Sequence, residues 1–461
     1  MGSQYASGVP GRTTQPPRHT TAIKIGIRRA LNDNDLPDTP LPASQLPPQG
    51  GSAAPLCVET GAVARDSVNS PPLHHKESPL FAADRGAFWR HLRGLGPVVK
   101  IEAGNPMLHG YYLTRRDDVR AALLDPETFM SPPKTFKIAS FGVPLPQVPL
   151  ACGTRTDHAR YGRVLHPLFS PKGLAPFAPV LRAQAATLID GVAATGQCDA
   201  TNLADAHARQ ALLVVCGLPA DDERAAQLIR AAVIGDADGK AELELFNWLD
   251  SQLGAGMRSP QRPPGILWPL VEGRRDKNFP LNPVEVAAVV LLLFSVAGIE
   301  MTAAATSFSL LRLARDPRLQ AQLREDPTQI PAFVEEMLRL EAPGPAIPRV
   351  TTKEVTIGGV TIPKHSAVWL GLEAAGRENG GDEIATAGDG KILRQRHWAF
   401  GSGIHRCLGM HLARLEMAEF LAEWLSRVPQ FELEPGFAPA ITHPPIGVTH
   451  LGSLKLRWEA R

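Results

Sequence analysis

Several features that define other classes of protein are scarce in this sequence of 461 residues. It has only five cysteines and no Cys-x-x-Cys pair, which argues against a disulfide framework and indicates a reducing compartment. The net charge of +2, without a long run of lysine and arginine, gives no reason to expect nucleic-acid binding. The longest apolar run, Val286 to Gly298, is shorter than the roughly 20 residues that span a bilayer. With no apolar signal segment at the N-terminus, we expect a soluble, cytoplasmic protein without a membrane anchor.

The first 75 residues differ in composition from the rest. They are rich in proline, glycine, serine and threonine, with few aromatic residues and little periodicity, which is typical of disorder. We therefore expect a disordered extension over residues 1–75 and one domain over residues 76–461. Residues 1–32 contain five basic residues and no Asp or Glu, which resembles an organelle transit peptide. The alternative, which we favour, is a variable extension ahead of a cytoplasmic enzyme.

The remaining sequence predicts one helix-rich domain with a few short strands and no internal repeat. Residues 97–101 and 111–113 predict a pair of strands near its start. Residues 117–124 predict a short helix that ends at Asp125-Pro126. Residues 355–362 predict a hairpin, because two glycines stand at its turn.

The most informative stretch is Phe400–Gly409, where three glycines surround a single cysteine, Cys407. Apolar residues then recur at three- and four-residue spacing from Leu408 to Leu425, which predicts an amphipathic helix with Cys407 at its N-terminal end. The free N–H groups and the positive dipole end of a helix stabilise a thiolate there. A cysteinate presented in this way is the iron ligand of haem-thiolate enzymes, which favours O–O cleavage.

Two other interpretations of this cysteine are a buried free thiol and a zinc site. Free cysteine is commonly buried in intracellular proteins. A zinc site would use His405, Cys407 and His411 and would need a fourth ligand. The other cysteines are scattered along the chain, so no fourth ligand stands at a suitable spacing.

The stretch Phe400–Gly409 resembles the ligand loop of the cytochrome P450 family, in its leading Phe400, in Gly401 and in His405, Cys407 and Gly409. The resemblance implies a mainly α fold with small β-sheets, a triangular helical prism that encloses haem b. It implies that Cys407 is the axial ligand of the haem iron and that Phe400 and Gly401 lie against the haem. It also implies a monooxygenase of the soluble bacterial type.

A second motif is Glu336-Met337-Leu338-Arg339. An acid and an arginine three residues apart lie on one helical face and can pair, but such pairs are common on exposed helices. The resemblance identifies Glu336 and Arg339 as the family's E-x-x-R, a buried structural pair behind the haem. Removing one partner of a buried pair costs roughly 3–5 kcal/mol.

A third feature is the helix expected over residues 283–315, whose centre, Val286 to Phe294, is apolar on every face and therefore interior. A glycine at 298 costs about 1 kcal/mol inside a helix, and the carboxylate of Glu300 must be hydrated or paired. Violations of local rules concentrate at functional sites. This segment therefore predicts function rather than scaffold.

The segment Ala297–Thr302 resembles the family's oxygen-binding groove, A-G-x-[DE]-T. The resemblance implies that Ala297 and Gly298 face bound oxygen and that Glu300 delivers protons. Met301 stands where the family usually has threonine, and its thioether donates no hydrogen bond. Thr302 follows, but one residue along a helix rotates a side chain by about 100°. Met301 therefore indicates that oxygen activation depends on a substrate hydroxyl, on ordered water or on other chemistry, and these alternatives stay open.

Haem carries two propionates that require cationic or hydrogen-bonding partners. By resemblance, the partners are His405, Arg349 and His158. The family usually has an arginine four residues after this last histidine, where the chain has Gly162. Arg160 or Arg163 could replace it, although neither has the usual spacing.

The expected substrate is a hydrophobic small molecule, because the segments expected to wall the pocket are mostly apolar. These are residues 131–151, Phe294 with Ala297, residues 343–348 and residues 446–451. Basic residues near the ligand loop suit an acidic ferredoxin- or flavodoxin-type electron donor, itself served by a reductase. The basic residues are Arg394, Arg396, His397, Arg406 and Arg414.

The sequence thus indicates a haem-thiolate monooxygenase that inserts one oxygen atom of O₂ into an apolar substrate with electrons from a separate partner. Two alternatives remain open. One is an enzyme that uses peroxide or performs oxidative coupling. The other is a haem protein that binds a ligand without catalysis.

Overall fold

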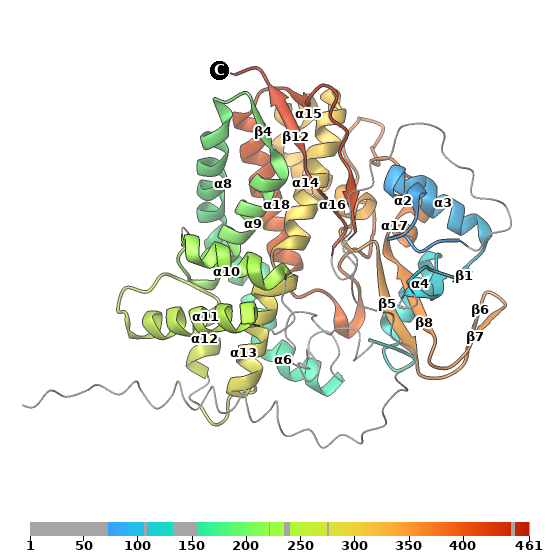
Figure 1. Ribbon diagram of the computed structural model, residues 1–461, viewed down its shortest axis with the longest axis horizontal. Helices are drawn as coiled ribbons and strands as arrows, with labels where there is room; N and C mark the ends of the chain where they lie inside the picture. Colours follow the sequence, from blue (N-terminus) through green and yellow to red (C-terminus); the bar gives the residue numbers. More distant parts are fainter. Residues whose placement is uncertain are drawn as a thin grey trace, which may run out of the picture. The chain divides into compact units, whose positions relative to one another are not determined.

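Long helices lie side by side in one region of the chain, and strands with shorter helices make up another (Figure 1). In this computed structural model the residues described are 72–105, 108–131, 155–220, 222–234, 240–273, 276–443 and 448–460. The α-helices are α2 Pro79–Ala83, α3 Arg85–Leu95, α4 Arg116–Leu124, α6 Arg155–Leu168, α7 Pro171–Leu174, α8 Ala178–Ala193, α9 Ala200–Cys216, α10 Glu223–Ile234, α11 Lys240–Arg258, α12 Leu267–Gly273, α13 Pro283–Leu292, α14 Glu300–Arg315, α15 Pro317–Glu325, α16 Ile330–Leu340, α17 Leu372–Gly380 and α18 Met410–Arg427. Shorter helical turns are η4 Ala175–Phe177, η5 Leu293–Ala297, η6 Pro327–Gln329 and η7 Gly403–His405.

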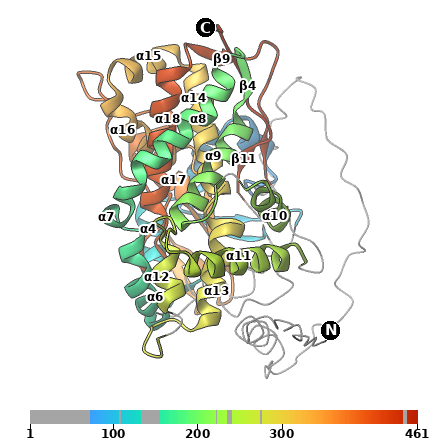
Figure 2. The ribbon, with the colours of Figure 1, turned by 90° about the vertical axis from the view of Figure 1, so that its left-hand side faces the viewer.

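Helix α14 runs through the helical region, packed against α9 and α18, and the two views of the ribbon show these three helices next to α8 (Figures 1 and 2). Nearly every side chain of α14 from Thr302 to Ala314 is buried. Small residues such as Ala304 and Ala305 allow the neighbouring helices to approach closely. The core on the α18 side is built around Phe420 and Trp424, both fully buried.

The helix expected over residues 283–315 is not continuous, which corrects that expectation. Helix α13 ends at Leu292, a π-helical turn covers Leu293–Ala297, and α14 begins at Glu300. The N–H of Gly298 donates to the carbonyl of Leu293 at 3.1 Å, five residues back rather than four. The wider turn and the absence of a side chain at Gly298 interrupt the helix beside the expected oxygen groove, since π-turns and glycine are ordinary causes of such breaks.

The main sheet has five strands in the order β1-β2-β8-β5-β3. Its strands are β1 Val98–Ile101, β2 Gly110–Leu113, β3 Phe129–Met130, β5 Ala346–Thr351 and β8 Ala367–Gly371. The smaller sheets comprise β4 Gln197–Asp199, β6 Val355–Ile357, β7 Val360–Ile362, β9 Phe431–Leu433, β10 Ile441–Thr442, β11 His450–Leu451 and β12 Lys455–Trp458.

Three of the expected elements are confirmed in the β region. Strands β1 and β2 pair antiparallel, with Val98 opposite Leu113. Helix α4 begins one residue before the expected position and ends at Leu124. In the hairpin β6–β7, Gly358 and Gly359 both have positive φ, 54° and 81°, which a two-residue turn of this hand requires.

The packed structure begins earlier than residue 76. Residues 1–71 lie outside the described residues, but His74 and His75 are buried. The ring of His75 contacts the Tyr112 hydroxyl, and the His74 ring packs on Trp369 with centroids 4.4 Å apart. Composition did not indicate this packing, because proline, serine and histidine are frequent around this segment. We propose residues 71–461 as the folded unit.

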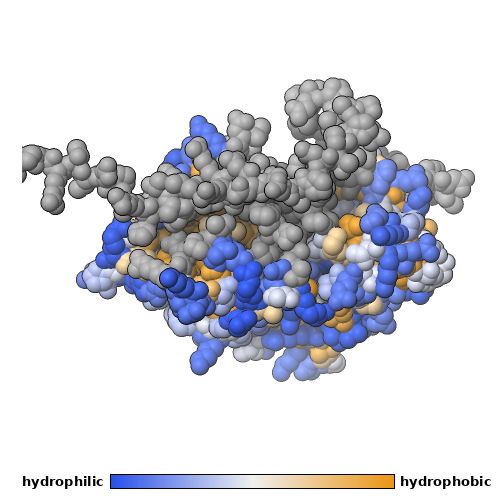
Figure 3. All heavy atoms as spheres, turned by 90° about the horizontal axis from the view of Figure 1, so that it is seen from below, coloured by the Kyte–Doolittle hydropathy of each residue, from blue (hydrophilic) through white to orange (hydrophobic). Residues whose placement is uncertain are grey.

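The surface seen from below is mostly hydrophilic where residues are coloured, with apolar residues in small groups between them (Figure 3). Among the described residues, no helix is both long enough and apolar enough to cross a membrane.

Candidate active site

Cys407 lies just before α18 and not within it. The helix begins at Met410 with Gly409 as its N-cap, so the periodicity that included Leu408 placed the start too early. The backbone N–H of Cys407 donates to the carbonyl of Phe400 at 2.9 Å, which closes the loop. Cys407 is exposed at the surface of this structure, but the surrounding protein still desolvates its thiol and raises the pKa, while the N–H groups of Gly409 and Met410 act in the opposite direction. The helix N-terminus therefore points its donors at the sulfur, as the sequence predicted.

The ligand loop is held against α4 and α18. Gly403 has a φ of 70°, and a Cβ there would lie 2.6 Å from the carbonyl oxygen of Leu123 at the end of α4. Phe400 lies under the guanidinium of Arg414, 4.6 Å from its ring centre. Gly401 also has a positive φ of 64°. The loop thus follows a backbone path that side chains at these two glycines would strain.

Two of the histidines expected at the haem propionates meet in the structure. The rings of His158, on α6, and His405, in η7, contact edge to face with centroids 4.5 Å apart. Nε2 of His158 is buried and makes no hydrogen bond within the described part of the chain, and burial lowers the pKa of this ring. A buried, unsatisfied ring nitrogen requires a polar partner. A haem carboxylate would satisfy it, so the residues present fit the group.

Arg349, the third expected propionate partner, is on β5 and is buried, with 7% of its surface exposed. Its Nη1 donates to the carbonyl of Pro348 at 2.7 Å.

Arg160, one of the two proposed replacements for the missing arginine, is not available to bind a propionate. Its guanidinium donates to both carboxylate oxygens of Glu285, at 2.6 and 2.7 Å. Arg163 is exposed.

Glu336 and Arg339 form the expected pair, and both side chains are completely buried. Nη2 of Arg339 donates to Oε2 of Glu336 at 2.7 Å. Both side chains also form hydrogen bonds with backbone groups. Arg339 donates to the carbonyls of Gly376, Gly381 and Glu383, and Glu336 accepts from the N–H groups of Ala385 and Gln395. The pair therefore ties α16 to the segment that leads to the ligand loop.

On the oxygen side, Glu300, Met301 and Thr302 point in different directions. Burial raises the pKa of the Glu300 carboxyl, partly opposed by His450. Met301 is 39% exposed, and its Cε lies 3.4 Å from the Cβ position of Gly344. Thr302 is buried. The structure thus turns Thr302 away from the side that Met301 faces, as the helical rotation predicted.

Thr302 faces a buried carboxyl that sequence reasoning missed, Glu416 on α18. Burial raises the pKa of Glu416 far above its ordinary value, and the Thr302 hydroxyl opposes this. Neither carboxyl oxygen of Glu416 makes a hydrogen bond of normal geometry within the described residues. Nε2 of His207 lies 3.3 Å from the Glu416 carbonyl oxygen. The signal was present, because Glu416 continues the buried stripe of Leu412 and Phe420 at four-residue spacing.

Ala297 is exposed although it lies between buried neighbours, Phe294 and Ile299. Gly298 is half-buried, and a Cβ there would lie 2.6 Å from the Leu293 carbonyl oxygen. Of the expected pocket walls, most of residues 131–151 and residues 446–447 lie outside the described residues. Residues 343–348 lie next to Met301 through Gly344.

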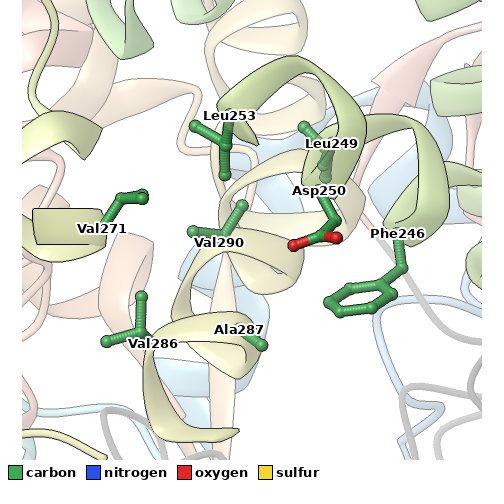
Figure 4. Close-up of a pocket in the computed structure, with 8 residues that line it drawn as sticks. All are labelled: Phe246, Leu249, Asp250, Leu253, Val271, Val286, Ala287 and Val290. Carbon is green, nitrogen blue, oxygen red and sulfur yellow. The ribbon is translucent and has the colours of Figure 1, made fainter. Parts of the chain in front are cut away.

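A small cavity of about 20 Å³ lies between α11, α12 and α13 (Figure 4). Apolar side chains line it, and the Asp250 carboxylate is directed into it. Its size suits a single water molecule, and none of the expected site residues lines it. The zinc alternative also lacks support, since no three His, Cys, Asp or Glu side chains in the described ranges are grouped to hold a metal ion.

Comparisons with known proteins agree with this geometry. The family model described as Cytochrome P450 matches residues 270–379. The chain is 32% identical over 343 residues to a probable cytochrome P450 127A1 of Sinorhizobium fredii, covering 72% of this chain and 80% of that protein. It is 31% identical over 349 residues to a 20-oxo-5-O-mycaminosyltylactone 23-monooxygenase of Streptomyces fradiae, covering 73% and 81%. The solved structure of CalO2 superposes with a TM-score of 0.71 at 23% identity, over 82% of this chain and 96% of that one.

Proposed function

Because the chain belongs to the cytochrome P450 family, it is a haem b monooxygenase, and we propose that it takes electrons from a separate ferredoxin- or flavodoxin-type protein and oxidises an apolar small molecule. The observation that carries the choice of partner is an exposed basic surface beside the ligand loop. The observation that bears on the oxygen chemistry is Met301 beside Glu300.

Haem b supplies the activation of O₂ and the delivery of one oxygen atom to the substrate. When it is bound, Cys407 would hold the iron through a thiolate that the N–H groups of Gly409 and Met410 stabilise. His158, His405 and Arg349 would bind the propionates. Burial raises the pKa of the Glu300 carboxyl, which favours its protonated form, so Glu300 is the candidate proton donor.

The basic surface beside the ligand loop is smaller than the sequence suggested. Arg414 donates to Glu335 at 2.8 Å and His397 lies 3.0 Å from the same carboxylate, so both side chains already have a partner. Burial by itself would raise the pKa of Glu335, but these contacts outweigh it and lower the pKa to about 2. The exposed cations that remain are Arg394, Arg396 and Arg406, together with Arg115 and Arg120 around α4, whose end touches the loop. Such a surface attracts an acidic partner and accelerates encounter.

Charge reversal tests this surface. In the variant Arg394→Glu/Arg396→Glu, we expect the KM for an acidic ferredoxin to rise about tenfold, since electrostatic steering changes association rates by roughly 10–10³. Reduction by dithionite and haem content should stay unchanged. The measurement is the reduction rate against ferredoxin concentration at two ionic strengths, because salt should weaken the wild-type interaction more than that of the variant.

The matched control is Arg258→Glu, at the exposed end of α11. It changes net charge by the same amount per site without touching the ligand loop. An equal rise in KM for Arg258→Glu, or no rise for the double variant, would contradict a docking surface at this position. Turnover supported by hydrogen peroxide and not by any reduced partner would favour the peroxide-using alternative.

Met301 predicts poor coupling between electron consumption and product formation. A substrate without a hydroxyl near the oxygen-binding site does not replace the threonine hydroxyl that Met301 lacks. No hydrogen bond at position 301 then directs the proton from Glu300, and electrons should be lost as hydrogen peroxide. Met301→Thr should raise the product formed per NADPH severalfold, since general acid placement is typically worth roughly 10²–10⁴-fold. The measurements are NADPH consumed, peroxide released and product formed.

Met301→Leu is the control for this test, because leucine is similar in size and also lacks a donor. Its coupling should equal that of the parent. If the parent is tightly coupled with every substrate tested, ordered water already supplies the missing group. If Met301→Thr helps with other substrates but not with the native one, the native substrate supplies its own hydroxyl.

A further inference from the structure

One face of α6 carries two histidines on either side of the glycine that stands where the family usually has an arginine. His158, Gly162 and His166 follow one another at four-residue spacing on this helix, so they share one side. His158 is in edge contact with His405 of the ligand loop. This face of α6 therefore looks onto the haem loop.

His166 is exposed, and its ring occupies the place that a side chain at the buried position 162 would take. A Cβ on Gly162 would lie 2.9 Å from Cε1, 3.1 Å from Nδ1 and 3.4 Å from Nε2 of His166. Helical side chains lean toward the N-terminus of their helix, so the imidazole reaches back over Gly162 in the direction of His158. A positive charge on His166 is close enough to act on the ring of His158.

Two other cations of this helix, Arg160 and Arg163, are unsuitable. Arg160 is committed to Glu285, and Arg163, one position from Gly162, is rotated by about 100° from the shared face. The usual arginine is absent at position 162, and the His166 imidazole lies against the place where its Cβ would be. Among the described residues of this face, His158 retains an unsatisfied buried nitrogen.

We propose that His166 binds a haem propionate carboxylate in place of the arginine that is absent at position 162, acting together with His158. The proposal rests on haem b binding and is independent of the proposed electron donor and substrate. Gly162 is essential to it, since any side chain at this position would displace the His166 ring.

The test is the rate of haem loss from the holoprotein to excess apomyoglobin. His166→Ala should lose haem about tenfold faster than wild type, because a hydrogen bond to a charged group is worth roughly that factor. The double variant Gly162→Arg/His166→Ala should restore slow loss, since arginine then enters the space that the imidazole leaves. His91→Ala, an exposed histidine on α3, should behave as wild type.

Reconstitution with haem dimethyl ester separates a propionate contact from packing. With both carboxylates esterified, wild type and His166→Ala should lose the cofactor at the same rate. The proposal is overturned if His166→Ala retains haem as wild type does, if its difference persists with the ester, or if the double variant gives no recovery. His166→Gln, which keeps a donor without charge, should lose haem at an intermediate rate and replaces the alanine variant if that variant fails to fold.

Discussion

Replacing Cys407 with alanine is expected to abolish the red-shifted Soret band of the reduced carbon-monoxide complex, which is diagnostic of thiolate ligation. The reason is that the sulfur of Cys407 lies at the loop that Phe400 closes, with the N–H groups of Gly409 and Met410 directed at it. No other cysteine of the described residues stands beside this loop. The measurement is the reduced-plus-carbon-monoxide difference spectrum of the purified variant, together with its haem content.

Cys198→Ala is the control, since Cys198 lies on β4 and pairs with β12. It should keep the band at full intensity. A thiolate-type spectrum that survives in Cys407→Ala would show that another residue ligates the iron. Loss of the band in both variants would point to unfolding and not to ligation, which circular dichroism of the two proteins distinguishes.

Glu336→Gln is expected to destabilise the folded protein by about 3–5 kcal/mol. Removal of the carboxylate leaves the Arg339 guanidinium charged and fully buried, with its strongest acceptor lost. It also weakens the hydrogen bonds that position 336 accepts from the backbone N–H groups of Ala385 and Gln395. These two residues belong to the segment that leads to the ligand loop. We expect lower haem content and a lower urea midpoint, measured by circular dichroism and by the Soret absorbance.

The matched control is Glu432→Gln on β9. Glu432 accepts from Arg457 at 2.6 Å, but both side chains are about half exposed. Exposed pairs contribute roughly 0–1 kcal/mol, so the urea midpoint should hardly move. Equal effects of the two substitutions would contradict a structural role that depends on burial, and a stable Glu336→Gln with full haem content would contradict it as well.

Motifs confined to a few neighbouring residues could be predicted from the sequence. The strands β1 and β2, the helix α4 and the glycine turn of β6–β7 depend on local preferences and on spacing. The pairing of Glu336 with Arg339 depends on helical spacing, although only the resemblance indicated that the pair is buried. The loop around Cys407 combines both kinds of information.

Errors arose where the backbone departed from regular geometry or where distant segments met. The apolar run from Val286 predicted one long helix, because periodicity does not register a single wider turn such as the one at Gly298. The buried His74 and His75 were assigned to a disordered extension, since their partners Tyr112 and Trp369 lie far along the chain. Arg160 was considered a propionate partner until its contact with Glu285 placed it elsewhere.

By itself the sequence determined the family and the cofactor class and indicated Cys407 as the candidate iron ligand, because a ten-residue loop with fixed glycines and one thiol needs no distant partner to be recognised. Only the tertiary structure decided which polar groups are already satisfied. It showed that Arg414 and His397 are paired with Glu335, that Thr302 faces Glu416, and that His166 covers Gly162. The first two facts depend on contacts between segments that are far apart in the chain, and the third depends on the direction that the His166 ring takes on its own helix, so spacing alone does not specify them.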